Sequence, residues 1–392
     1  MIKNLNWPLM QNNISKSDLN ALIKYLSSEN PRLTHGNKVL EFENAWNLWL
    51  DSKYSVMLNS GSSANDLTML AVRELLGPGE IIVPPLTWVS DVASVIHAGH
   101  TPVFVDIDKD SLAIRTDRVL EAITKKTKAV FLTHVLGFNG LTDQLIQELN
   151  RRNILLIEDV CESHGAKHNG RKVGTFGFAS NFSYYYAHHM TTIEGGMVST
   201  NDSNFYESIR MMRSHGLLRE STDLEFKSEQ QLKHPDLNKE FIFMSIGHNM
   251  RPTEINGILG IEQLTKLSHN VEVRNSNFEI FLSNLDSNLY KTDFKVEGCS
   301  NYAFTLVLNK ADFRRRDKIE EVLNKCSVEF RRGLSGGGNQ IRQPYLKNRI
   351  ELPNLKHFEN VEHIHNFSWY IGNYPELDTS KIPELTNILN TI

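Results

Sequence analysis

The sequence predicts an α/β protein with a doubly wound, mostly parallel central sheet. Between about residues 54 and 200, short apolar runs alternate with stretches of helical periodicity. This alternation is typical of β-α-β units with right-handed crossovers. Several of the short runs are almost continuously apolar, as expected for strands that helices cover on both faces.

Strands and helices follow one another in a regular order along this region. Runs with the composition of strands occur at Tyr54–Asn59, Glu80–Val83, Pro102–Asp106, Lys128–Thr133, Ile154–Asp159 and Ser180–Tyr186. Helical periodicity occurs between them at Ser62–Leu76, Trp88–His97, Thr116–Ile123 and Asp143–Arg151. The carboxyl ends of the parallel strands should form the edge at which such folds bind ligands.

The second half of the chain departs from this alternation. The segment from Leu217 to Phe243 is charged and polar without periodicity, which predicts a loop or flap over a site. The segments that follow are helical at Thr253–Leu267 and Asn270–Leu285, a strand at Tyr302–Leu308, a helix at Asp312–Asn324 and a strand at Val328–Arg331. We therefore expect a large domain with the N-terminal segment and the flap over residues 1–252. A smaller α+β domain with its connecting helix should occupy residues 253–392.

The composition excludes several classes of protein. The 42 basic and 46 acidic residues give a net charge of −4, so no overall field attracts nucleic acid or an anionic membrane. Three scattered cysteines exclude a disulfide framework and a Cys-x-x-Cys site, and no apolar run approaches the ~20 residues of a membrane span. His363 and His365 alternate on a segment expected at the surface, where solvation is their predicted role, so no metal site is predicted. We expect a cytoplasmic protein.

Three segments at predicted strand ends could form a ligand site. Asn59-Ser60-Gly61-Ser62-Ser63-Ala64-Asn65 opens a helix, where free amides favour a phosphate; an ordinary N-cap is the alternative. Asp159 ends an apolar strand, and a carboxylate there can keep a pyridinium nitrogen protonated or simply cap a helix. Trp88 could stack on a flat ring or belong to the core.

Further stretches have the same order and spacing as motifs of a known family. They are Val105-Asp106-Ile107-Asp108, Gly174-Thr175-Phe176-Gly177, Phe182-Ser183, Glu194-Gly195-Gly196, Arg213-Ser214-His215-Gly216 and Gly247-His248-Asn249-Met250-Arg251-Pro252. Together with the segments above, they resemble the DegT/StrS sugar aminotransferase family over nearly the whole chain. The resemblance implies a fold-type I, aspartate aminotransferase-like fold and a pyridoxal phosphate cofactor.

His188 stands where the aminotransferases of this family carry the lysine that anchors the cofactor. That lysine lies six residues after the phenylalanine matched by Phe182 and six before the acidic residue matched by Glu194. An imidazole can transfer a proton near neutral pH, but it cannot form a Schiff base as a lysine amine does. A lone histidine is more often structural, but at this position the sequence resembles the nucleotide-sugar 3-dehydratase branch of the family.

The resemblance assigns a role to each matching residue. Gly61, Ser62 and Ser183 would bind the cofactor phosphate, Trp88 would stack on the ring, Asp159 would pair with the ring nitrogen, and Glu162 would lie near the ring hydroxyl. In a homodimer with shared active sites, Asn249 would reach the partner's phosphate. Arg219, Arg251 and Glu329 would contact the substrate, and His188 would be the catalytic base and acid.

The implied reaction uses non-covalently bound pyridoxal 5′-phosphate, which L-glutamate converts to the pyridoxamine form. The C3 hydroxyl of a nucleotide-linked 4-keto-6-deoxy sugar is then lost, and 2-oxoglutarate, ammonia and a 3,6-dideoxy-4-keto sugar are released. Such sugars serve O-antigen or capsular polysaccharide synthesis. No iron–sulfur cluster is implied, because related CDP-sugar dehydrases use four cysteines and this chain has three.

Two alternatives remain open at this point. The chain could be an aminotransferase that tolerates histidine and makes a 4-amino sugar, or a non-catalytic cofactor-binding homologue. The resemblance favours GDP over CDP and leaves the choice between hexose and heptose open.

Overall fold

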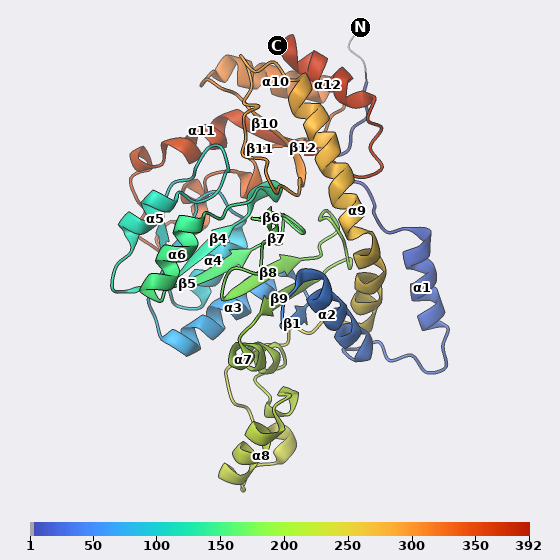
Figure 1. The fold of residues 1–392 in the computed structure, drawn as a ribbon, viewed down its shortest axis with the longest axis vertical. Helices are drawn as coiled ribbons and strands as arrows, with labels where there is room; N and C mark the ends of the chain where they lie inside the picture. Colours follow the sequence, from blue (N-terminus) through green and yellow to red (C-terminus); the bar gives the residue numbers. More distant parts are fainter. Residues whose placement is uncertain (1–3) are drawn as a thin grey trace.

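Seven strands form the central sheet of the computed structural model, which describes residues 4–392. They are paired in the order β1-β9-β8-β5-β4-β2-β3 (Figure 1). The strands are β1 Tyr54–Leu58, β2 Glu80–Val83, β3 Thr101–Phe104, β4 Thr127–Thr133, β5 Leu155–Asp159, β8 Ala179–Ser183 and β9 Gly196–Thr200. Strands β3, β2, β4, β5 and β8 are parallel, whereas β9 is antiparallel to both β8 and β1. The predicted α/β class with a mostly parallel sheet is confirmed.

Helices cover both faces of this sheet. One face packs against α2 (Asn37–Leu50), α5 (Thr116–Ala122), α6 (Asp143–Arg152) and the first part of α9 (Glu254–Asn284). The other face packs against α3 (Gly61–Leu76), α4 (Val89–His97) and α7 (Ser203–Arg213). Successive strand residues point to opposite faces, so Met57 lies in the first core and its neighbours Val56 and Leu58 in the second. Burial on both sides explains the continuous apolar runs in the sequence.

A second, antiparallel sheet of three strands forms the C-terminal part of the molecule, in the upper part of Figure 1. Its strands are β10 (Ala303–Val307), β12 (Ser368–Gly372) and β11 (Phe330–Arg332), in that order. Helices α10 (Phe313–Lys325), α11 (Glu359–Phe367) and α12 (Lys381–Asn390) pack into the same core. The long helix α9 joins the two parts, because Leu267 and Val271 belong to the large core and Phe281 to the C-terminal one.

The N-terminal segment packs on the C-terminal sheet, although the sequence placed it with the large domain. Leu5 and Trp7 are buried in the C-terminal core, and the Trp7 indole N–H donates to the Gly372 carbonyl at 2.8 Å. Helix α1 (Lys16–Leu26) then lies against α9, where Gln263 donates to the Asp18 carboxylate at 2.7 Å. The division at residues 252 and 253 stays a prediction.

The segment from Leu217 to Phe243 is not entirely a loop, so that expectation was wrong in part. It contains helix α8 (Leu224–Lys233), capped by the Asp223 side chain, between two short 3-10 turns at Leu218–Glu220 and Lys239–Phe241. No residue of α8 is buried, and in Figure 1 the helix projects away from the sheet. A helix without a buried face has no apolar periodicity to reveal it.

Strands β6 (Lys167–His168) and β7 (Arg171–Lys172), of two residues each, pair with each other as a small antiparallel hairpin.

Candidate active site

A cavity of about 360 Å³ lies at the carboxyl ends of the central strands. Its volume is within the usual range of small-molecule sites. The ends of β4, β5 and β8 contribute Thr133, Asp159 and Ser183, and the opposite wall comes from the C-terminal part. Seven predicted site residues line it: Gly61, Ser62, Trp88, Asp159, Glu162, Ser183 and His188. The fold therefore brings together segments that are far apart in the sequence.

The N-terminus of α3 forms one side of the cavity. Ser60 caps the helix by accepting the Ser63 amide at 3.1 Å, and Gly61 and Ser62 form the first turn. The first amides of a helix have no partner within it, so they are available to an anion. A Cβ on Gly61 would lie 2.6 Å from the Ser183 Cβ, which requires glycine at this position. The predicted phosphate residues thus meet in one cradle.

Asp159 is buried at the end of β5, with one face toward the cavity. Its Oδ1 accepts the Cys161 amide at 2.8 Å, and its Oδ2 accepts the Asn65 side-chain amide at 3.1 Å. Both carboxylate oxygens are therefore oriented by fixed donors. This geometry suits the predicted partner of a ring nitrogen.

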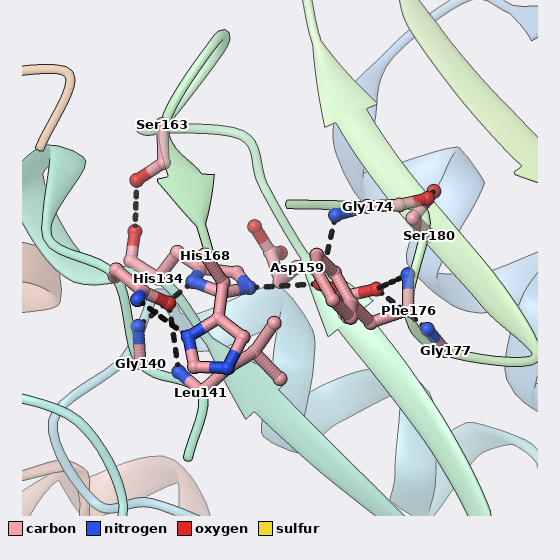
Figure 2. Close-up of polar contacts among 12 residues, drawn as sticks. His134, Gly140, Leu141, Asp159, Ser163, His168, Gly174, Phe176, Gly177 and Ser180 are labelled. Atoms are coloured by element: carbon pink, nitrogen blue, oxygen red, sulfur yellow. Dashed lines mark hydrogen bonds and ion pairs between the residues drawn. The ribbon is translucent and has the colours of Figure 1, made fainter. Parts of the chain in front are cut away.

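Glu158, the neighbour of Asp159, has a structural role on the other face of the strand. Its carboxylate accepts the amides of Gly174, Phe176 and Gly177 at 2.7, 3.0 and 2.7 Å. His134 accepts the Gly140 amide through Nδ1, so its Nε2–H donates to Glu158 at 3.2 Å. Figure 2 shows His134 and the Gly174–Gly177 turn beside Asp159. The Gly174–Gly177 motif thus anchors the strand that presents Asp159.

Glu162 faces the cavity from the loop after β5. It accepts the Leu136 amide at 2.9 Å and the Ser335 hydroxyl at 2.9 Å. Burial raises the pKa of its carboxyl to about 7. A group with this pKa can hold or release a proton near neutral pH. Ser335 comes from the glycine-rich segment of the C-terminal part, so the contact joins the two parts of the molecule.

His188 projects into the cavity after β8. Its ring lies 5.5 Å from that of Tyr302 and 6.1 Å from that of Tyr185, centroid to centroid, and its buried Nδ1 has no protein partner. Burial, and then the positive charge of Arg274, lower the pKa of the imidazole to about 3. His188 is therefore neutral at physiological pH and can accept a proton.

Trp88 lies at the mouth of the cavity, where it is the N-cap residue of α4 and 52% exposed. The reading of Trp88 as a core aromatic is thus wrong. An exposed indole beside a cavity is available to stack on a flat ligand.

Four predicted site residues do not line the cavity. Asn249 is exposed and Arg251 half-buried, both beyond the flap, and Arg219 pairs with Glu220 and Glu240 at 3.9 and 3.8 Å. Glu329 is exposed, and its Oε2 accepts the Leu9 amide at 2.9 Å. In the structure Glu329 holds the N-terminal segment, which itself lines the cavity through Leu9 and Met10. The roles of all four residues stay predictions.

Several residues that the sequence analysis did not select also line the cavity. They are Ser90, Thr133, Tyr185, Glu194, Tyr302, Arg331, Ser335 and Tyr370. Those from the C-terminal part had no motif to reveal them, because their position depends on how that part packs against the strand ends. The sequence analysis placed Arg331 in a predicted strand but proposed Glu329, in the same predicted strand, as the substrate contact.

His363 and His365 do not lie on an exposed segment. His363 and His365 are half-buried in α11 and make hydrogen bonds with the Leu308 carbonyl at 2.6 Å and the Asn339 amide at 3.3 Å, so solvation is not their role. Within residues 4–392, no cluster of three or more potential ligands is placed to hold a metal ion. None of the helices in that range is long and apolar enough to cross a membrane.

A model of the DegT/DnrJ/EryC1/StrS aminotransferase family matches residues 12–390. The chain belongs to this family. Among relatives, it is 32% identical to GDP-4-keto-6-deoxy-D-mannose 3-dehydratase of Yersinia pseudotuberculosis, over 98% of each chain. It is also 29% identical to GDP-perosamine synthase of Caulobacter vibrioides, over 76% of each chain.

A solved structure of the same kind of dehydratase has a similar fold. E. coli GDP-4-keto-6-deoxy-D-mannose-3-dehydratase with bound hydrated PLP superposes with a TM-score of 0.86 at 30% identity, covering 98% of this chain and 100% of that one. The predicted aspartate aminotransferase-like fold is thus confirmed. The resemblance found in the sequence is confirmed as well, down to the relatives of the 3-dehydratase branch.

Proposed function

We propose that this enzyme removes the C3 hydroxyl of a nucleotide-linked 4-keto-6-deoxy sugar. One observation supports this reaction above amino-group transfer: His188 lines the cavity and, in the part of the chain that the structure describes, no lysine does. A lysine amine would bind the cofactor aldehyde covalently. An imidazole cannot form this Schiff base, but it can transfer protons near neutral pH.

The cofactor is pyridoxal 5′-phosphate, in exchange with its pyridoxamine form, and it is held without a covalent bond. The α3 cradle of Gly61 and Ser62, with Ser183, would bind its phosphate, and Trp88 would stack on the ring. Asp159 would hold a proton on the ring nitrogen, and Glu162 would lie near the ring hydroxyl. When bound, the cofactor supplies the amine that condenses with the sugar ketone and an aromatic ring that accepts electrons.

His188 would act twice in the reaction. As a neutral imidazole it would accept a proton, and the resulting imidazolium would then give a proton to the departing C3 hydroxyl. A pKa of about 3 makes the imidazolium a strong proton donor. The anionic phosphates of cofactor and substrate would raise this pKa toward the working pH, where proton transfer is most efficient.

Positive side chains near the cavity suit a nucleotide diphosphate. Arg331 lines the cavity and extends from β11, and a guanidinium binds phosphate through paired N–H groups. Arg219 and Arg251 would contact the substrate from the flap side, and Glu329 through the N-terminal segment. GDP is the favoured nucleotide, because the relatives reported above are named for GDP-linked sugars.

L-Glutamate is the proposed amino donor, and the net reaction balances with it. Its oxidation to 2-oxoglutarate and ammonia takes up the oxygen that the sugar loses. The enzyme would work as a homodimer, with Asn249 of one subunit near the cofactor phosphate of the other. A place in O-antigen or capsular polysaccharide synthesis would follow from the 3,6-dideoxy sugar product.

The product distinguishes this function from its alternatives. The enzyme is incubated with pyridoxal phosphate, L-glutamate and GDP-4-keto-6-deoxymannose, and ammonia and the product mass are followed. We expect ammonia in step with sugar turnover and a product lighter by one oxygen atom. A 4-amino sugar without ammonia would establish an aminotransferase, and cofactor binding without turnover of 4-keto sugars would favour the non-catalytic reading.

Variants at His188 test its role directly. His188→Asn should keep the fold and lose about 10²–10⁴ in rate, the usual contribution of a general acid–base group. His188→Lys should retain the cofactor covalently after dialysis and stop releasing ammonia. Ammonia release at the wild-type rate in both variants would refute the assignment.

A further inference from the structure

Asp91 is a second buried carboxyl behind the cavity, and neither the sequence motifs nor the proposed reaction uses it. It lies in the first turn of α4 with no exposed surface. Its Oδ1 accepts the Asn65 side-chain amide at 2.7 Å, and its Oδ2 accepts the hydroxyls of Thr133, at 2.7 Å, and Thr87. A buried carboxyl needs hydrogen-bond partners of this kind. The side chains of Thr87, Thr133 and Asn65, however, do not by themselves require an acid at position 91.

Asn65 links this carboxyl to Asp159. The same Nδ2 group donates to Asp91, to Asp159 at 3.1 Å and to the Ser90 hydroxyl at 3.0 Å. The Asn65 oxygen is occupied by the Asn181 amide at 2.9 Å, whose own oxygen accepts the Thr68 hydroxyl at 2.8 Å. This chain fixes the orientation of the Asn65 amide, so its two protons point toward the oxygens of Asp91, Asp159 and Ser90.

The charges around Asp91 are negative or neutral. Burial, and then the negative charge of Asp159, raise the pKa of the Asp91 carboxyl well above its usual range. The Cys161 thiol and the Tyr345 hydroxyl are the other titratable groups that interact with Asp91, and burial raises the pKa of both. Within residues 4–392 no cation is among the groups that act on the Asp91 carboxyl, so two ionised carboxylates would repel each other in this buried site.

We propose that Asp91 is a positioning residue which, as a neutral acid and through Asn65, holds Asp159 in place for the cofactor ring nitrogen. The inference rests on the cofactor placement of the proposed function, but not on the fate of the sugar. In this arrangement Asp159 bears the one negative charge of the pair. Asp91 keeps Asn65 from turning away. As an acid it donates its proton from Oδ2 to one of the two threonine hydroxyls, and that hydroxyl then donates to the other threonine, 2.7 Å away, instead of to Asp91.

Substitution by asparagine separates the neutral-acid role from a need for charge. In Asp91→Asn, the new amide oxygen can accept from Asn65 and the new NH₂ group can donate to the hydroxyls of Thr87 and Thr133. In Asp91→Ala all of these bonds are lost. The two variants thus differ in hydrogen bonding while both lack a negative charge.

The measurements need only the protein and pyridoxal phosphate. Affinity is obtained by titration of the apoprotein, and the pH at which the absorbance of the bound cofactor changes reports the ring nitrogen. We expect Asp91→Asn to bind within about threefold of the wild type. Asp91→Ala should bind at least about tenfold more weakly, as for a lost hydrogen bond to a charged group, with the absorbance transition at lower pH.

A double-mutant cycle with Asn65→Ala distinguishes an effect that Asp91 exerts through Asn65 from a general disturbance of the fold. If Asp91 acts through Asn65, the double variant Asp91→Ala/Asn65→Ala should bind no more weakly than the worse single variant. Wild-type affinity and absorbance in Asp91→Ala would overturn the inference, and so would a defect in Asp91→Asn as large as that of Asp91→Ala. A wild-type enzyme that binds the cofactor but makes an amino sugar would refute the dehydratase alone.

Discussion

His188 and two neighbouring histidines form a cluster with depressed pKa values. His164 and His189 are buried beside His188, with ring centroids 6.1 Å apart for His164 and His188 and 5.6 Å for His164 and His189. Burial lowers the pKa of each imidazole, and Arg274 adds to the effect. A cluster of neutral rings therefore surrounds the one ring that reaches the cavity.

This cluster predicts how stability depends on pH. Each histidine is neutral in the folded protein at pH values where it is charged in the unfolded chain, whose pKa is about 6.5. Unfolding then takes up protons, so stability is complete above about pH 6.5 and falls as the pH drops toward the folded pKa of each group. The stability of His188→Asn should fall less steeply, by at most about 1.4 kcal/mol per pH unit. Urea unfolding of the apoprotein between about pH 7 and about pH 5 measures this.

The matched control is His269→Asn, which makes the same change at an exposed position of α9. It should leave the pH dependence as in the wild type. If the unfolding free energy changed with pH at the same slope in all three proteins, His188 would titrate in the folded protein as it does in the unfolded chain.

The residues of the site differ in how far the sequence could predict them. His188 could be located by counting from Phe182 and from Glu194, because both belong to motifs of the resembling family that flank this position. Arg331 and Tyr370 could not, because no local pattern records which residues of the small sheet face the strand ends. Glu329 shows the consequence: it precedes β11 and accepts the Leu9 amide, whereas Arg331 within β11 lines the cavity.

At the scale of an element, the start of α3 illustrates how backbone rather than side chains can form a site. A Cβ at Gly61 would lie 2.6 Å from the Ser183 Cβ and 3.2 Å from the Cys161 sulfur. Gly61→Ala must therefore push β8 and α3 apart, at a cost of about 1–3 kcal/mol as for other overpacked cores. Thermal unfolding should show this loss, and pyridoxal phosphate should bind more weakly because the amides no longer converge with Ser183.

Ser62→Ala is the comparison for this variant. It removes a hydroxyl from an exposed neighbour and leaves the backbone unchanged, so cofactor affinity should fall far less. Wild-type affinity in Gly61→Ala would contradict the cradle.

The elements predicted from the sequence share one property: each of them buries one or both of its faces. The strands β1 to β5 and β8 are apolar because helices cover both their sides, and α3 and α6 show the period of a half-buried helix. By contrast, α8 has no buried residue. The five-residue strands β9 and β12 were not predicted, although nearly all of their residues are buried. Their pairing depends on residues far away in the chain, which local periodicity does not reveal.

At the scale of the whole molecule, the flap side exposes more apolar surface than a single chain requires. Phe241, Phe243 and Ile246 are exposed, Ile246 by 86%, next to the exposed Asn249. Exposed apolar groups that cluster in this way usually mark an interface. The same surface holds Asn249, which the family resemblance directs to a partner subunit, so the proposed interface and the proposed shared site would coincide.

Phe243→Asp should therefore weaken both the proposed dimer and cofactor binding. A charge in an apolar interface must be desolvated without a partner, so light scattering should show monomer at concentrations where the wild type is dimeric. Pyridoxal phosphate affinity should fall with the loss of dimer, because Asn249 could then reach no second cofactor. Phe313→Asp is the matched control, since Phe313 on α10 is 56% exposed and Phe243 57%. A monomeric wild type with full cofactor affinity, or equal effects of the two variants, would contradict the shared site.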